Sequence, residues 1–306
     1  MPLFTRRNFL RTAGLAGAAS LAGLPALAGR RSSDNLLTIL HTNDTHSRID
    51  PFPDNDPNYP GMGGYARRAA IIAHQRKQNP NLLLLDAGDM FQGTPYYNMY
   101  GGEPELKLMS KMGYDAAAFG NHEFDNGLDG FKKVLPFASF PFLSANYDFS
   151  RTLLASDIKS FIIIEKGGRK IGVYGLGINP EGLVSRSLYA ETKYNDPIEV
   201  ARTVEEVLYA QHHCDLIICL SHLGFRYEDV ERPSDMKLAA NTRFTDIIIG
   251  GHTHNLLDPS VVVGNQQNKP VSIAQAGFGG AYLGMINVSF DDPRGEKLVE
   301  AYTTKI

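Results

Sequence analysis

Short apolar runs alternate with longer stretches of helical character over most of the chain. Continuous runs rich in Val, Ile, Leu and Ala predict β-strands that are buried on both faces. They lie at residues 36–40, 82–85, 116–119, 161–164, 171–174, 216–220, 247–249, 271–274 and 285–290. Helices are predicted between them, at residues 64–78, 103–111, 127–135 and 197–212. This alternation predicts an α/β architecture with helices packed outside a sheet core.

Two local signals add detail to this pattern. Asp196 followed by Pro197 is typical of a helix N-terminus, because Asp accepts hydrogen bonds from free backbone N–H groups and Pro fits the first turn. Residues 50–64 are rich in proline and glycine. They predict a long loop beside the first strand, in a position to border a functional site.

Composition narrows the class of protein. The chain has 306 residues, of which 43% are hydrophobic and 21% charged, as expected for one large globular domain or two small ones. Its net charge is −3, which argues against a nucleic-acid polymer or an anionic membrane as a general partner. Cys214 and Cys219 lie on opposite faces of one predicted strand, which predicts two buried free thiols.

The N-terminus has the pattern of an export signal. A basic segment at residues 5–11 precedes an Ala/Gly/Leu-rich run, and Ala26 and Ala28 form an A-x-A cleavage site. We therefore expect residues 1–28 to be a signal peptide and the mature protein to be periplasmic or secreted. Arg6-Arg7 followed by Phe-Leu resembles a twin-arginine signal, which implies the twin-arginine translocase as partner. An ordinary secretory signal is the alternative.

Candidate metal ligands follow five of the predicted strands. In an α/β sheet the loops after the strands form the usual binding site. Each of these residues alone also fits a structural role, but five of the nine histidines in the chain lie in the segments after these strands, namely His122 and the four among the candidate ligands. The candidate ligands are Asp44, His46, Asp89, Asn121, His222, His252 and His254.

This set of side chains favours particular metal ions. Carboxylate, amide oxygen and imidazole together suit Mn, Zn, Fe, Co or Ni as divalent ions, and no cluster of cysteines points to a structural zinc site. Two such ions about 3.5–4 Å apart share a bridging carboxylate, and together they can bind a phosphoryl oxygen and activate water. The sequence therefore predicts two divalent metal ions.

Five ordered motifs carry a resemblance to a known family. They are Asp44-x-His46, Gly88-Asp89, Gly120-Asn121-His122-Glu123, Ser221-His222 and Gly251-His252-x-His254. Together they resemble the calcineurin-like metallophosphoesterases, and within them the N-terminal catalytic domain of the bacterial 5′-nucleotidase family. The resemblance implies a four-layer α/β/β/α sandwich and a division of the ligands. One metal would be bound by Asp44, His46, Asp89 and His254, and the other by Asp89, Asn121, His222 and His252.

The same resemblance implies two catalytic residues. His122 matches the family's catalytic histidine, which lies beside the metals, and Asp125 matches the acid that orients it. The implied reaction is in-line attack on phosphorus by a metal-activated hydroxide, with His122 stabilising or protonating the leaving oxygen. Alternatively, Asp125 caps the turn before Gly127.

We therefore expect an exported hydrolase of phosphate monoesters, with small-molecule nucleotides as the substrate class. Residues 29–306 would be its catalytic domain, without the C-terminal substrate-recognition domain of full-length 5′-nucleotidases, so a separate chain could supply that domain. Alternatives are a phosphodiesterase or sulfate-ester hydrolase on the same scaffold, and a non-catalytic binding subunit.

For other polar residues the sequence predicts less specific roles. His41, Asp86 and Glu123 are predicted to be structural, with Asp86 supporting the loop of Asp89. Arg67 and the neighbouring Arg68 either approach an anionic substrate or lie on a solvated helix face.

Overall fold

The predicted strands assemble into two six-stranded sheets in the part of the chain that the computed structural model describes, residues 36–290 and 297–306. The expected signal peptide, residues 1–28, lies outside the described residues. Among the described helices, none combines the length and the apolar character needed to cross a membrane.

The first sheet has the strand order β14-β13-β1-β2-β3-β4. Its strands β1 to β4 run parallel, whereas β13 pairs antiparallel with both β1 and β14. The register places Leu40 of β1 opposite Met285 of β13 and Leu84 of β2. The bounds are β1 Leu36–Thr42, β2 Leu82–Asp86, β3 Ala116–Ala118, β4 Phe142–Leu143, β13 Tyr282–Ser289 and β14 Leu298–Lys305.

The second sheet has the strand order β11-β12-β10-β9-β7-β6. Its four central strands run parallel, and an antiparallel strand closes each edge. The bounds are β6 Phe161–Lys166, β7 Arg169–Gly177, β9 Leu216–His222, β10 Ile247–Gly250, β11 Val261–Gly264 and β12 Pro270–Ala274. A short separate pair joins β5 (Tyr147–Asp148) to β8 (Lys193–Tyr194).

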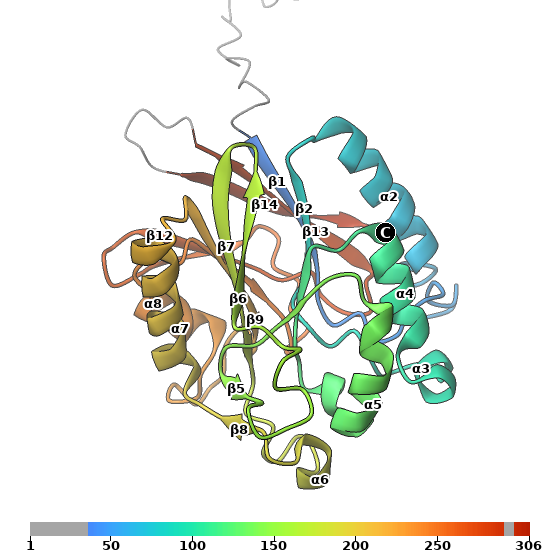
Figure 1. Ribbon diagram of the computed structural model, residues 1–306. Helices are drawn as coiled ribbons and strands as arrows, with labels where there is room; N and C mark the ends of the chain where they lie inside the picture. Colours follow the sequence, from blue (N-terminus) through green and yellow to red (C-terminus); the bar gives the residue numbers. More distant parts are fainter. Residues whose placement is uncertain (1–35, 291–296) are drawn as a thin grey trace, which may run out of the picture. The chain divides into compact units, whose positions relative to one another are not determined.

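Helices cover the outer face of each sheet, as Figure 1 shows. The first sheet packs against the helices α2 (Tyr65–Gln78), α3 (Pro95–Tyr100), α4 (Glu103–Met112) and α5 (Gly127–Val134), and the second against α7 (Pro197–Glu206) and α8 (Asp235–Asn241). A third apolar layer, which includes Ile39, Leu85, Ile218 and Ile249, lies between the sheets. The layers are therefore α/β/β/α, and the predicted fold class is confirmed.

The remaining short elements are connections. They are α6 (Arg186–Tyr189) and the single turns η2 (His122–Phe124) and η3 (Leu135–Phe137). The helix predicted at 197–212 begins as expected, because the Asp196 carboxylate accepts hydrogen bonds from the backbone N–H of Ile198 and Glu199. It changes after Glu206 into a π-helical turn, η4 (Val207–Gln211).

Some expectations for the sheets were incomplete or wrong. Every predicted apolar run overlaps a strand, but β11, β14 and the two-residue strands β4, β5 and β8 were not predicted. Strand β6 is not buried on both faces, because it is an antiparallel edge strand whose residues are half-buried or exposed. An edge strand has a neighbour on one side alone, so its apolar run is covered less completely than a central strand.

Four buried residues test the predictions for the core. Cys214 and Cys219 are free and buried, as predicted. His41 lies fully buried against Gly284 of β13, and burial lowers its pKa to about 4, so a neutral structural role is confirmed. Both interpretations of Arg68 are wrong, because its side chain is fully buried and its guanidinium lies 4.4 Å from the centre of the Tyr65 ring.

Candidate metal centre

The ends of the parallel strands from both sheets bring the predicted ligands together. Loops after β1, β2 and β3 carry Asp44, His46, Asp89 and Asn121, while His222 ends β9 and the loop after β10 carries the last two histidines. Two groups of potential ligand atoms form, each with its atoms within 4.8 Å of one another. The groups are Asp44, His46 and His254, and Asp89, His222 and His252.

Asn121 belongs with the second group. Its carbonyl oxygen Oδ1 lies 2.9 Å from Nδ1 of His252, which is itself a member of that group. All seven predicted ligands therefore lie in one of two adjacent clusters. The clusters also follow the division that the family resemblance implied.

Within each group the potential ligand atoms lie close to one another. Nε2 of His46 lies 3.2 Å from Nε2 of His254, which in turn lies 3.5 Å from Oδ1 of Asp44. Oδ2 of Asp89 lies 2.9 Å from Nε2 of His222, yet this nitrogen is buried without a partner in hydrogen-bond geometry. Bonds of about 2.0–2.2 Å to one ion place neighbouring donor atoms about 3–3.5 Å apart. The spacing therefore fits metal coordination.

The backbone of these loops is held in an unusual conformation. Five candidate ligands have φ between 46° and 71°, the left-handed region that costs non-glycine residues free energy. Such a conformation persists where surrounding structure enforces it, and it is concentrated at functional sites. These five residues are Asp44, His46, Asp89, His252 and His254.

Hydrogen bonds to the backbone orient two of the imidazoles. Nδ1 of His222 lies 2.7 Å from the carbonyl oxygen of Ala87, and Nδ1 of His46 lies 3.2 Å from that of Phe91. A carbonyl oxygen can only accept, so each Nδ1 carries the proton and donates it. The opposite nitrogen, Nε2, is then the one that faces the centre of the group and that a metal ion would bind.

Burial keeps most of these imidazoles neutral. It lowers the pKa of His46 to about 4 and that of His252 to about 3, and it also lowers the pKa of His254. Burial acts on His222 in the same direction, but the charges of Asp89 and Asp44 and the hydrogen bonds to Asp89 and Ala87 together outweigh it and raise the pKa to about 10. The Asp89 charge acts to raise the pKa of all four histidines. One carboxylate is therefore close enough to influence both groups.

Asp44 is a fully buried carboxylate. Its oxygens accept hydrogen bonds from the backbone N–H of His252, at 2.9 and 3.0 Å, and from the Asn43 amide at 2.7 Å. Burial nevertheless raises the pKa of Asp44 to about 7, although His222 acts against this shift. A carboxylate so far from water is stabilised in its charged form by a nearby cation. The donor set therefore fits divalent metal ions in both groups.

Other polar residues support the loops, as the sequence predicted. The Glu123 carboxylate accepts hydrogen bonds from the backbone N–H of Asp89, Met90 and Gly120, so it is occupied in fixing the loop after β2. Asp86 accepts from the N–H of Gly88 at 2.9 Å. Gly120 must be glycine, because a Cβ atom there would collide with the Asp89 carboxylate.

His122 and Asp125 form a pair at the edge of the centre. Nδ1 of His122 lies 2.7 Å from Oδ2 of Asp125, across the η2 turn, and both side chains are partly exposed. Burial lowers the pKa of His122, but the hydrogen bond to Asp125 and the Asp89 charge together raise it to about 9. The backbone N–H of His122 donates to Oδ1 of Asp89 at 2.9 Å. The His122 ring lies 5.2 Å from that of His46, so the pair is fixed beside the candidate ligands.

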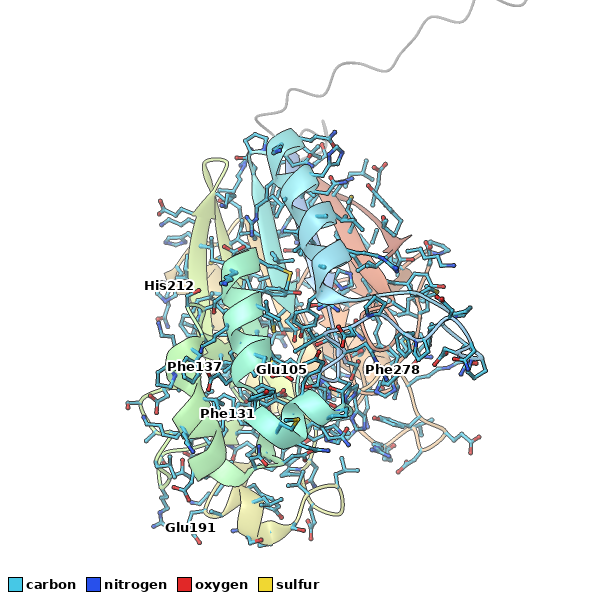
Figure 2. The ribbon with its side chains drawn as sticks, turned by 90° about the vertical axis from the view of Figure 1, so that its right-hand side faces the viewer. Glu105, Phe131, Phe137, Glu191, His212 and Phe278 are labelled. Carbon is cyan, nitrogen blue, oxygen red and sulfur yellow. The ribbon has the colours of Figure 1, made fainter. Side chains whose placement is uncertain are left out.

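One residue at the site was missed by the sequence reasoning. The ring of Phe278 lies 4.7 Å from that of His254 and 5.3 Å from that of His46, measured between centroids. Figure 2 labels Phe278 among the loops that lie beyond one end of α2. The available signal was its position in a glycine-rich stretch, between Gly277 and Gly279. Tyr59, from the loop predicted at 50–64, packs nearby, so that loop does border the site.

Comparison with known proteins identifies the family. Residues 37–256, well over half of the chain, match the family described as calcineurin-like phosphoesterase. The snake venom 5′-nucleotidase of Crotalus adamanteus is 37% identical over 278 residues, which cover 84% of this chain and 45% of that protein. The trifunctional nucleotide phosphoesterase protein YfkN of Bacillus subtilis is 33% identical over 84% of this chain and 18% of its own length.

A solved structure agrees with this assignment. The 5′-nucleotidase precursor from Thermus thermophilus superposes with a TM-score of 0.78 at 34% identity, over 89% of this chain and 54% of that chain. The chain thus spans about half, or less, of the length of these relatives. The match to the family model and the shared fold establish that the chain belongs to the calcineurin-like phosphoesterase family.

Proposed function

We propose that this protein is a two-metal hydrolase of phosphate monoesters, with nucleotides as the substrate class. The observation that carries the proposal is the pair of adjacent donor clusters, one around Asp44 and one around His222, with the Asp89 charge acting on the histidines of both. Two divalent ions close together are the usual centre for phosphoryl transfer to water. Nucleotides are proposed because the relatives are named 5′-nucleotidase and nucleotide phosphoesterase.

The seven candidate residues have distinct proposed roles. Asp44, His46 and His254 would hold one ion, and Asn121, His222 and His252 the other, with Asp89 shared between them. Divalent ions bound there supply Lewis acidity and lower the pKa of water. The ligand residues supply position: their loops are held by backbone hydrogen bonds, such as that from the N–H of Asp44 to the carbonyl of Gly88.

His122, oriented by Asp125, would donate a proton to the leaving oxygen. Because Asp125 raises the pKa of His122, its imidazole is charged near neutral pH and can donate from Nε2 to the leaving oxygen. Asp125 also fixes the ring orientation through Nδ1. The alternative cap role for Asp125 has less support, since helix α5 begins without a side-chain hydrogen bond at its N-cap, Asn126.

Substrate profiling tests this function. Protein loaded with manganese or cobalt is expected to hydrolyse an aryl phosphate and nucleoside monophosphates faster than phosphodiesters or sulfate esters, and chelation should remove the activity. Release of inorganic phosphate measures the rates. A preference for diesters or sulfate esters would favour the alternative hydrolase, and no turnover of any ester would refute the enzyme assignment. That a separate chain supplies the substrate-recognition domain is a further prediction, which this assay does not test.

Export is a second part of the proposal. We infer a twin-arginine signal at residues 1–28, followed by the catalytic domain at 29–306, and a periplasmic or secreted location. Replacing Arg6 and Arg7 together by lysine preserves their charge but removes the arginine pair. The precursor is expected to accumulate in the cytoplasm, as measured by fractionation and immunoblotting. Unchanged export of the variant would instead indicate an ordinary secretory signal.

A further inference from the structure

An aromatic ring lies directly against the first group of candidate ligands. The Phe278 ring is tilted by 38° relative to the ring of His254 and by 41° relative to that of His46. The side chain of His254 is 40% exposed, so this side of the centre is open to solvent. Phe278 itself is only partly buried. A half-covered aromatic ring therefore lies at the opening of the proposed catalytic centre.

Two further aromatic residues extend this surface away from the centre. The ring of Tyr59 lies 6.3 Å from that of Phe278, and the ring of Phe52 lies 5.0 Å from that of Tyr59. Phe52 is buried, and the Arg48 guanidinium lies 4.4 Å from its ring centroid. We call Phe52, Tyr59 and Phe278 the aromatic wall. Phe52 anchors the wall in a small apolar cluster, while Tyr59 and Phe278 keep part of their surface available.

The backbone that carries Phe278 is fixed to the centre. The N–H of Gly279 donates to the carbonyl oxygen of Asp44 at 2.8 Å, and the N–H of Gly277 donates to that of Asn255 at 2.9 Å. Gly279 has a φ of +62°, and a Cβ atom there would collide with the Phe52 ring. The turn therefore requires glycine at this position, and the Phe278 ring is held before any ligand binds. Such preorganisation reduces the entropy lost on binding.

We propose that the aromatic wall is a stacking subsite for the planar part of the leaving nucleoside, with a nucleobase as the chemical class it would take. This proposal rests on the proposed phosphomonoesterase function and names which part of the substrate the chain itself recognises. The face of an aromatic ring stacks on any base, independently of its hydrogen-bonding edge. Phe278 is the member of the wall nearest to the candidate ligands, so it is the ring that the base of a nucleotide with its phosphate at the centre would meet first.

A packing role for Phe278 predicts a different result from a stacking role. If Phe278 only supports His254 and His46, its loss weakens hydrolysis of every phosphate ester to the same degree. If it stacks on the base, its loss weakens substrates that contain a base more than substrates without one. The test therefore compares AMP with ribose 5-phosphate, which carry the same phosphorylated ribose and differ in the base.

The first measurement is the ratio of kcat/KM for AMP to that for ribose 5-phosphate, using the full chain loaded with manganese. Phe278→Ala is expected to lower this ratio about fivefold to tenfold, the range of one aromatic stacking contact. Phe278→Trp is expected to keep the ratio near that of the unmodified protein. The matched control is Tyr209→Ala, which removes an exposed aromatic ring that stacks on Phe244 instead. That variant should leave the ratio unchanged.

A binding measurement provides a readout that does not need turnover. Isothermal titration calorimetry gives the ratio of affinities for non-hydrolysable phosphonate analogues of AMP and of ribose 5-phosphate, and Phe278→Ala should reduce it by a similar factor. Equal loss for both compounds, or an unchanged ratio in both assays, would overturn the stacking subsite. If the unmodified protein hydrolysed neither ester, the proposed function would fail, while the affinity ratio would still decide whether Phe278 stacks on the base.

Discussion

Asp89→Asn is expected to release both metal ions and to lower kcat/KM for phosphate esters about a thousandfold or more, because a two-metal centre contributes several kcal/mol to the rate. Asp89 belongs to the second group of donors, and its charge also acts on His46 and His254 of the first group. An amide has the same shape but no charge to share between two cations. Metal content by inductively coupled plasma mass spectrometry and phosphate release together measure the outcome.

The control for this variant is Asp129→Asn, the same chemical change on the exposed face of α5. It should retain two ions and full activity. Circular dichroism establishes whether each variant is folded. Asp89→Asn protein that stayed folded with both ions bound would exclude Asp89 as the bridge.

His122→Ala is the second change with a large expected effect. Loss of a general acid typically costs about 10²–10⁴-fold in rate, so kcat should fall by that factor while both metals remain. The metals should be retained because His122 belongs to neither donor group. Its backbone N–H, which donates to Asp89, is unchanged in the variant. His74→Ala, on the exposed side of α2, is the control and should leave kcat unchanged. Parallel loss of metal and activity would make His122 a ligand instead.

The pH profile separates the role of Asp125 from simple support of the turn. Asp125 acts to raise the pKa of His122, so removing its charge lowers that pKa. The protonated imidazole is the form that donates, hence kcat declines as pH rises through the pKa of His122. In Asp125→Asn this alkaline limb should therefore move to lower pH, in addition to any fall in the maximum rate. An alkaline limb at the same pH in both proteins would contradict the orienting role.

Much of the fold was predictable because the central strands are covered on both faces. Buried parallel strands need continuous apolar runs, and residues 82–85 and 247–249 provide them. Strand β14 could not be recognised in this way. Its sequence alternates polar and apolar residues, and its stability depends on antiparallel pairing along β13, where Leu283 lies opposite Thr304.

The candidate metal ligands were predictable because they lie in short sequence motifs. Ligand residues must follow strands to meet at one edge of the sheets, so Asp44 and His252 were visible as candidates in the sequence. Tertiary contacts decided the rest. A guanidinium on a helix normally reaches water, and only the packing of Arg68 against Tyr65 and Gly280 explains its complete burial. Phe278 could not be identified from the sequence either, because its place at the site depends on a contact with His254, which precedes it by more than twenty residues.

Anomalous diffraction from crystals of the manganese-loaded protein would show whether a pair of metal ions shares Asp89. We predict two anomalous peaks about 3.5–4 Å apart, one on each side of the Asp89 carboxylate. One peak should lie among Asp44, His46 and His254, and the other beside Asn121, His222 and His252. A single peak, or two peaks of which neither lies next to Asp89, would contradict the account.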